Sequence, residues 1–336
     1  MRVALAGCGT MGIRYADRLS QMEEVQLAGV FARSQEKVSA FAEHYGTEGF
    51  TSFDEMMQRT DPDAVCIALP TFLHKEFVLK AAAYGKPVIC EKPLALSVEE
   101  ASVMIEACER SGAKLFVGHV LRFFPEYRAI RDSVLSSEIG RTGVAHAKRA
   151  TFYPYAGSGW QADPDQSGGV IMDLMIHDID FMRWTLGEVR SVYAMGRKLQ
   201  GLEYALVTLR FQSGAVASLE GFWGYPGPFT TSVELAGTEG ILRLDNQSTQ
   251  PIRVLKRAAG TSGSDPVAMP PNHSVQDPYD IELRRFIACI RDGKESPVTP
   301  QEALKAVEIA QAAVQSMKTG RPVTWESATE GYGWIK

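Results

Sequence analysis

The glycine spacing near the start of the chain constrains the fold more than any other feature. Residues 7–12 read GCGTMG, which fits the pattern GxGxxG. The apolar run at residues 3–6 comes directly before it, and a helical pattern over residues 11–21 follows. A strand, a glycine turn and a helix in this order predict the first unit of a doubly wound parallel sheet.

Strand and helix signals keep alternating along the next part of the chain. Apolar runs predict strands at residues 25–31, 64–69, 88–90 and 115–117. Helical patterns cover residues 77–84 and 98–111, and Ser97 can cap the second of them. Continuous apolar strands separated by helices are typical of a parallel sheet covered on both faces. Residues 1–120 are therefore predicted to form a Rossmann dinucleotide-binding domain.

The pattern changes near Gly118, which predicts a second domain over residues 121–336. Longer strands with alternating polarity are expected at residues 145–151, 191–195, 204–211, 216–221, 231–236 and 240–245. Short turns with glycine connect several of them, and residues 257–272 read as a surface loop. Two amphipathic helices close the chain. The predicted fold class is thus α/β plus α+β: a Rossmann sheet, then a domain on an open, meandering and mostly antiparallel sheet.

Composition excludes several classes of protein. A chain of 336 residues with 45% hydrophobic and 22% charged residues is long enough for two folded domains and is not a disordered chain. The net charge of −5 and the lack of a basic block argue against nucleic acid as a partner. No apolar stretch is long enough to cross a membrane, and the first strand begins too early for a signal peptide.

Cysteine usage agrees with a reducing compartment. The five cysteines are an odd number, form no CxxC pair and lie mostly within apolar runs. They are expected to be reduced, packed thiols, and the expected location is the cytoplasm.

Each glycine of the GxGxxG segment has a separate expected role in holding a dinucleotide. Gly7 permits the tight turn, Gly9 lets the backbone approach a pyrophosphate, and Gly12 allows close contact between helix and strand. Thr10 and Met11 lie at the start of the helix, where free N–H groups and the positive end of the helix dipole attract phosphate. A glycine turn without a ligand is the alternative, and the surrounding strand and helix pattern disfavours it.

The end of the second strand bears on the choice between NAD and NADP. An acidic residue there would bind the ribose 2′-hydroxyl and repel a 2′-phosphate. Ala32 stands at the expected acidic position, and Arg33 and Ser34 can supply a cation and a hydroxyl to a 2′-phosphate. NADP is therefore favoured over NAD, with a solvated surface role for Arg33 as the alternative.

Two further motifs make the chain resemble a known family. The sequence EKP at residues 91–93 ends a buried strand, and residues 168–178 read GGVIMDLMIHD. Together with the glycine loop, with Leu69, Pro70, Thr71 and His74, and with GRPV at residues 320–323, they resemble the Gfo/Idh/MocA oxidoreductases over essentially the whole chain.

The resemblance implies roles for individual residues. It implies an active site of Lys92, Asp173 and His177. It further implies cofactor contacts from the following residues: Leu69, Pro70, Thr71, His74, Glu91 and Lys92.

The candidate active-site residues also make chemical sense by themselves. Lys92 follows a strand at the edge where parallel sheets bind ligands, and loss of hydration there favours a neutral amine that can exchange a proton. Asp173 and His177 are four residues apart, so one helix would present both on one face. The alternatives are an ion pair between Lys92 and Glu91 and a buried structural role for His177.

A metal site is a further alternative, and it is disfavoured. Asp178 and Asp180 would have to join Asp173 and His177 as ligands. Their side chains point to other faces of the expected helix, so no metal is predicted.

Substrate contacts are expected from the segment that joins the two domains and from the aromatic residues before the Asp/His helix. The resemblance places His119 and Arg122 at the cleft, where Arg122 could bind a hydroxyl or carboxylate; an interdomain salt bridge is the alternative. Tyr153 and Trp160 can stack on a sugar ring and bond its hydroxyls, with a hydrophobic lid or core contact as the alternative. No definite role is predicted for four other aromatic residues: Phe152, Tyr155, Trp223 and Tyr225.

The expected reaction is hydride transfer between a nicotinamide cofactor and a secondary alcohol or ketone of a sugar, a cyclic polyol or a derivative. The hydroxyl proton would go to His177 or Lys92. Two other function classes stay open: glycoside hydrolysis through a transient redox step, and a non-catalytic sensor. The uncovered face of the second sheet must be buried or polar, and members of the resembled family often pair such faces, so the resemblance implies a homodimer or homotetramer.

Overall fold

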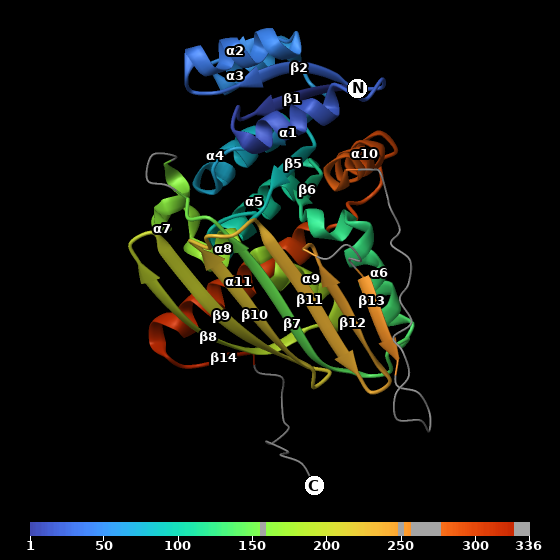
Figure 1. Ribbon diagram of the computed structural model, residues 1–336. Helices are drawn as coiled ribbons and strands as arrows, with labels where there is room; N and C mark the ends of the chain where they lie inside the picture. The colour runs from blue at the N-terminus through green and yellow to red at the C-terminus, as the bar shows by residue number, and fades with distance from the viewer. Residues whose placement is uncertain (155–158, 248–251, 257–276, 326–336) are drawn as a thin grey trace. The chain divides into compact units, whose positions relative to one another are not determined.

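The computed structural model describes residues 1–154, 159–247, 252–256 and 277–325 (Figure 1). The chain divides into two compact units. The first comprises Met1–Ala129, Pro154–Asp180 and Asn272–Gln311. The second comprises Ile130–Tyr153, Phe181–Pro271 and Ala312–Lys336. The chain therefore passes between the units several times, and the predicted domain boundary near residue 120 stays a prediction.

The first unit contains a six-stranded sheet with the order β3-β2-β1-β4-β5-β6, in which every pair is parallel. The strands are β1 (Arg2–Ala6), β2 (Gln26–Phe31), β3 (Gly49–Phe50), β4 (Ala64–Ile67), β5 (Val88–Glu91) and β6 (Leu115–Gly118). This order confirms the predicted doubly wound Rossmann sheet. The short strand β3 was not predicted, since two residues give no periodic signal.

Helices connect these strands. Those that lie within the first unit are α1 (Thr10–Leu19), α2 (Gln35–Tyr45), α3 (Phe53–Thr60), α4 (Thr71–Ala83), α5 (Val98–Ser111), the 3-10 helices η1 (Val120–Phe123) and η3 (Trp160–Ala162), α7 (Pro164–Ser167), α8 (Gly169–Asp173) and α10 (Pro278–Arg291). Three more helices continue from one unit into the other: α6 (Pro125–Leu135), α9 (Ile176–Leu186) and α11 (Pro300–Thr319).

The helix boundaries follow from capping chemistry. Ser97 accepts a hydrogen bond from the N–H of Glu100 at the start of α5, and Gly112 ends the helix in the left-handed conformation. The prediction for residues 98–111 is confirmed at both ends. Helix α2 was not predicted, although Ser34 and Gly46 give it the same pair of caps.

A helix from late in the chain completes the core of the first unit. Phe286 of α10 packs against Phe116 of β6 and Phe123 of η1, with ring centroids 5.4 Å apart in both pairs. All three side chains are buried. Burial of three aromatic side chains fixes the end of β6 and the residues that follow it.

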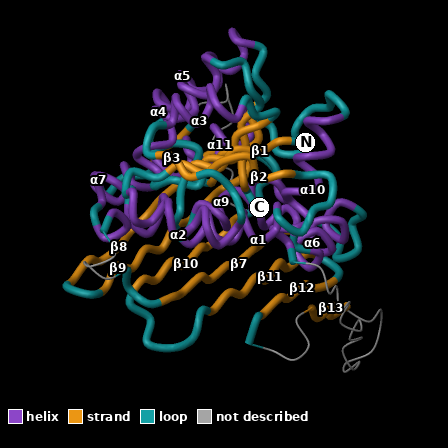
Figure 2. Tube along the Cα trace, turned by 90° about the horizontal axis from the view of Figure 1, so that it is seen from above, coloured by secondary structure: helices purple, strands orange, loops and turns teal. Residues whose placement is uncertain are grey.

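The second unit contains an eight-stranded sheet with the order β13-β12-β11-β7-β10-β9-β8-β14. Figure 2 shows its strands from β13 to β8 side by side. Its strands are β7 (Thr142–Thr151), β8 (Val189–Leu199), β9 (Leu202–Phe211), β10 (Val216–Trp223), β11 (Thr230–Gly237), β12 (Gly240–Asp245), β13 (Ile252–Lys256) and β14 (Val323–Thr324). The open, mostly antiparallel sheet is confirmed. The loop expected at residues 257–272 lies outside the described residues.

The expected meander is wrong in one respect. Strand β7 lies between β10 and β11, parallel to β10 and antiparallel to β11. Ala147 of β7 is the register partner of both Leu219 and Val233. All the strands share the same alternating pattern, so the sequence did not reveal which strand enters the middle.

One face of this sheet is packed and the other carries exposed apolar side chains. On the packed side, the N–H of Ala194 donates to Ser316 Oγ of α11 at 3.0 Å. Val144, Tyr193 and Met195 are exposed on their strands. The homodimer or homotetramer predicted for this face stays a prediction.

None of the helices in the described ranges is long and apolar enough to span a membrane. All five cysteines carry free thiols, and four of them are buried. The cytoplasmic location stays a prediction.

Gly12→Ala is expected to destabilise the protein. A Cβ at Gly12 would lie 2.0 Å from the carbonyl oxygen of Gly7, so the backbone would have to move, at a cost of about 1–3 kcal/mol. Gly9→Ala is the matched control, because nothing lies within 4 Å of its Cβ position. Thermal unfolding should show a lower Tm for Gly12→Ala and an unchanged Tm for Gly9→Ala. Equal Tm values for the two variants would contradict this account of the loop.

Candidate active site

The glycine loop has the geometry of a phosphate-binding turn. Gly7 has a φ of +118°, and a Cβ there would lie 2.3 Å from the carbonyl oxygen of Ala68. Gly9 is exposed with open space beside it, and as the N-cap of α1 it offers no side-chain cap. The first turn, which includes Thr10 and Met11, has no acidic residue. The helix dipole and the uncapped N–H groups therefore make this end of α1 suitable for an anion.

The end of β2 lies next to this loop, because the N–H of Gly7 donates to the carbonyl of Phe31 at 2.9 Å. Arg33 is exposed and forms no ion pair within the described ranges. Ser34 Oγ accepts the N–H of Lys37 at 3.4 Å as the N-cap of α2. Its hydroxyl proton is therefore still available to a ligand, and Ala32 adds no charge.

Lys37 was missed from the sequence. It is exposed in the first turn of α2, and its charge acts on the pKa of Cys8 in the glycine loop. The spacing of Arg33 and Lys37, four residues apart across a Ser N-cap, is the signal that could have revealed it. Burial raises the pKa of Cys8 to about 11, so its thiol stays protonated near neutral pH.

His74 lies behind the predicted cofactor contacts. Its Nε2 is 2.8 Å from the carbonyl oxygen of Leu69, and its Nδ1 is 2.9 Å from that of Pro93. The side chain is buried, and burial lowers the pKa of the imidazole. His74 thus ties the segment after β4, with Pro70 and Thr71, to the turn after β5. A direct cofactor contact of His74 stays a prediction.

Lys92 and Asp173 lie together, although 81 residues separate them in the chain. Lys92 Nζ donates to the main-chain carbonyl of Asp173 at 2.8 Å and lies 3.5 Å from Asp173 Oδ1. Both side chains are largely buried. Glu91 instead accepts the main-chain N–H of Lys92 at 3.1 Å. Lys92 therefore pairs with Asp173, and not with Glu91 as in the alternative interpretation.

The single helix expected for Asp173 and His177 is wrong. Helix α8 ends at Asp173 and α9 begins at Ile176. At the break, the N–H of Met175 donates to the carbonyl of Val170, five residues earlier, at 2.9 Å. Such a widened turn is frequent at functional sites. His177 is half-buried in the first turn of α9.

Glu282 and Tyr15, which interact with Glu91, were missed from the sequence. All three side chains are buried, and burial is the largest cause that raises the pKa of the Glu91 and Glu282 carboxyls. The charge of Lys92 opposes this rise for Glu91, whereas repulsion by Glu91 adds to it for Glu282. A glutamate directly before Leu283, on the apolar face of the helix that contains Phe286, is the signal that could have revealed Glu282.

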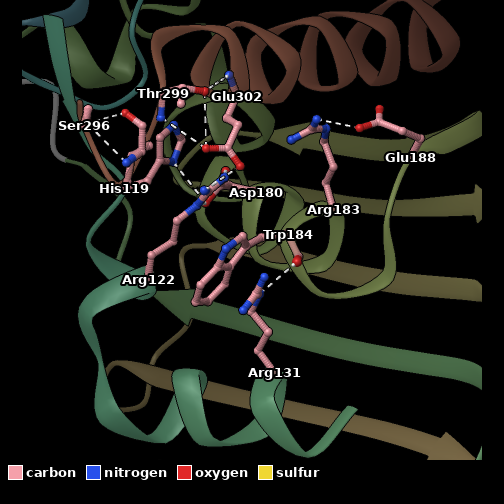
Figure 3. Close-up of polar contacts among 11 residues, drawn as sticks. His119, Arg122, Arg131, Asp180, Arg183, Trp184, Glu188, Ser296, Thr299 and Glu302 are labelled. Carbon is pink, nitrogen blue, oxygen red and sulfur yellow. Dashed lines mark hydrogen bonds and ion pairs between the residues drawn. The ribbon is translucent and has the colours of Figure 1, made fainter. Parts of the chain in front are cut away.

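Arg122 is held between two carboxylates (Figure 3). Its Nε and Nη2 donate to Asp180 at 2.9 and 2.7 Å, and its Nη1 lies 2.9 Å from Glu302 Oε1. Arg122 and Asp180 are almost fully buried, whereas the Glu302 side chain is 29% exposed. All three belong to the first unit. Arg122 therefore forms the salt bridge that was the alternative interpretation, although within one unit. These contacts do not support a role for Arg122 in substrate binding.

His119 joins the same cluster. Its side chain is 1% exposed, and its Nδ1 lies 3.7 Å from Asp180 Oδ2. Neither ring nitrogen has a hydrogen-bond partner within the described part of the chain. Because both nitrogens are also shielded from solvent, the predicted direct contact with a substrate stays a prediction.

The two predicted aromatic residues fall into different units. Tyr153 is half-buried in the second unit, 6.4 Å from the ring of Trp223. Trp160 is half-buried in η3 of the first unit. Tyr155 lies outside the described residues. No group of three or more metal-ligating side chains occurs where the structure is described.

Comparison with known proteins identifies the family. The model of the oxidoreductase family with an NAD-binding Rossmann fold matches residues 1–119, and the model of its C-terminal alpha/beta domain matches residues 131–325. The chain therefore belongs to the Gfo/Idh/MocA oxidoreductase family.

Individual relatives match almost the whole chain. The scyllo-inositol 2-dehydrogenase (NAD(+)) of Bacillus subtilis is 29% identical, with 96% of each chain covered. The 1,5-anhydro-D-fructose reductase of Ensifer adhaerens is 28% identical over 97% of this chain and 99% of the relative. Among solved structures, GenD2 from gentamicin A biosynthesis in complex with NAD has a TM-score of 0.86 at 26% identity, with 97% of each chain covered.

Arg122→Met is expected to reduce the free energy of unfolding by about 3–5 kcal/mol, because it leaves the buried carboxylate of Asp180 without its cation. Glu188→Gln is the control, since the Glu188 side chain that pairs with Arg183 is half exposed, and it should change stability by less than about 0.5 kcal/mol. Urea unfolding measures both. A loss for Arg122→Met no larger than that of the control would show that the cluster is not structural.

Proposed function

We propose that this chain is an NAD(P)-dependent dehydrogenase or reductase that acts on a secondary alcohol or ketone of a sugar, a cyclic polyol or a derivative. The contact between Lys92 Nζ and Asp173 supports this most strongly, because it gathers two of the proposed catalytic residues in one unit with the glycine loop. The family relatives named inositol dehydrogenase and anhydrofructose reductase support the substrate class.

The roles of the residues follow from their contacts. A bound nicotinamide dinucleotide supplies the hydride acceptor or donor. Lys92, fixed by the carbonyl and carboxylate of Asp173, presents its amine to the substrate oxygen and moves the hydroxyl proton. His177, at the start of α9, is the second proposed proton-transfer group. Gly9 and the start of α1 bind the pyrophosphate.

NADP is the proposed cofactor. Ala32 leaves the end of β2 without the carboxylate that would repel a 2′-phosphate, and Arg33, Ser34 and Lys37 offer two cations and a hydroxyl next to the glycine loop.

The function is tested with a panel of sugars and polyols, read by cofactor absorbance with NAD and NADP in parallel. Lys92→Met is expected to lower kcat by about 10²–10⁴-fold, because the proton-transfer amine is lost, and to leave the cofactor Kd nearly unchanged. Lys75→Met, which removes a partly exposed lysine of α4, should behave as wild type. Normal turnover by Lys92→Met would exclude the proposed role. Release of a sugar without a net change in cofactor absorbance would favour the redox-assisted glycosidase. Cofactor binding without turnover of any substrate in the panel would favour the non-catalytic sensor.

Arg33→Ala tests the cofactor preference. Loss of a charge-assisted bond to the 2′-phosphate should weaken NADP binding by about 10–100-fold and leave NAD binding unchanged. Fluorescence titration of each cofactor gives both Kd values, and Arg110→Ala, an exposed arginine of α5, is the control. Equal weakening of NAD and NADP would contradict a 2′-phosphate contact.

A further inference from the structure

We propose that His119, backed by Asp180, is a second proton acceptor, which receives a proton from Lys92 as the substrate hydroxyl gives its proton to Lys92. The proposal rests on the proposed function. During oxidation, one ammonium proton of Lys92 Nζ passes to the lone pair of a neutral His119 ring, which becomes an imidazolium. The substrate O–H bond breaks as the C–H hydride departs, and the hydroxyl proton adds to the lone pair that Lys92 Nζ has gained. Reduction of a ketone uses the same steps in reverse.

The sheet register brings the two residues to the same edge. Glu91 at the end of β5 is the register partner of Gly118 at the end of β6. Lys92 and His119 are the next residues of these neighbouring parallel strands, so both leave the sheet at its carboxyl edge. The charge of Lys92 is among the causes that lower the pKa of His119.

The His119 ring is buried with unused hydrogen-bonding capacity. Both ring nitrogens are shielded from solvent, and neither has a hydrogen-bond partner in the described ranges. Buried polar atoms of this kind are rare and need an explanation, such as a bound water or a role in catalysis. Because Lys92 and His119 follow neighbouring strand ends, a ring nitrogen that solvent does not reach can exchange a proton with Lys92 through one bound water.

Asp180 is placed to compensate the charge of an imidazolium. Its Oδ2 lies 3.7 Å from His119 Nδ1, which is longer than a hydrogen bond, as is common for catalytic contacts before the substrate binds (Figure 3). Protonation of the ring gives both nitrogens an N–H, and the contact with Asp180 then becomes a charged pair.

Four charged groups act on the pKa of the His119 imidazole: Lys92 after β5, Arg122 on η1, Asp180 on α9 and Glu302 on α11. Burial lowers the pKa of the imidazole most, Arg122 and Lys92 lower it further, and the two carboxylates raise it. The net direction is down, so the resting ring is neutral at neutral pH and is able to accept a proton.

The first test needs neither substrate nor cofactor. Histidine side chains of the full-length protein are labelled with ¹⁵N and titrated by NMR, and His119→Gln assigns the signal. The His119 pKa should lie below its ordinary value, rise in Lys92→Met and fall in Asp180→Asn. An unchanged His119 titration in Lys92→Met would overturn the proposal even if the enzyme proves to be an oxidoreductase.

The second test is the pH profile of substrate oxidation. The wild-type kcat should fall as the pH drops through the His119 pKa, because a protonated ring accepts no proton. His119→Gln should lose this acid limb and roughly tenfold or more of kcat, with the cofactor Kd unchanged. His44→Gln, an exposed histidine of α2, is the control. A His119→Gln profile that keeps the wild-type limb, with kcat within twofold of the control, would refute the relay. Should His119→Gln not fold, the titration in Lys92→Met decides alone.

Discussion

The hydrogen bond from Lys92 Nζ to the main-chain carbonyl of Asp173 is the interaction on which the proposed site depends. It joins the turn after β5 to the end of α8, across a separation of 81 residues in the chain. A carbonyl acceptor in the backbone fixes the amine more firmly than a side chain, because it has no rotamer freedom of its own. The break between α8 and α9, with its five-residue hydrogen bond, accompanies this contact.

Buried polar contacts near this bond stabilise the segments that carry the proposed site residues. His74 contacts the carbonyl oxygen of Leu69 after β4 and that of Pro93, the residue that follows Lys92. Arg122 clamps η1 to α9 through Asp180 and to α11 through Glu302. Buried ion pairs of this kind contribute little net stability compared with apolar packing, but each partner becomes costly to remove. The ion pair of Arg122 with Asp180 fixes the position of α9, the helix that also contains the proposed proton-transfer residue His177.

Local patterns predicted the Rossmann sheet and most of the second sheet because apolar runs, glycine spacing and caps are local signals. The contact of Lys92 with Asp173 followed only from family resemblance. The position of β7, the break after Asp173 and the carboxylates around Arg122 escaped prediction, since each depends on which distant segments meet. Arg122 shows the limit clearly: its sequence context allowed a ligand or a salt bridge, and only the positions of Asp180 and Glu302 favour the salt bridge. Glu282 differs from these cases, because its position on the apolar face of α10 is a local signal from which its burial could have been predicted.

Isotope tracing tests the central claim, that this site transfers a hydride between substrate carbon and nicotinamide. A polyol or sugar that the protein binds is deuterated at its carbinol carbons and incubated with oxidised cofactor, and the recovered nicotinamide is analysed by NMR. The account predicts one deuterium at C4 of the ring, on a single face. Reduced cofactor that contains no deuterium, or deuterium lost to solvent before transfer, would contradict it.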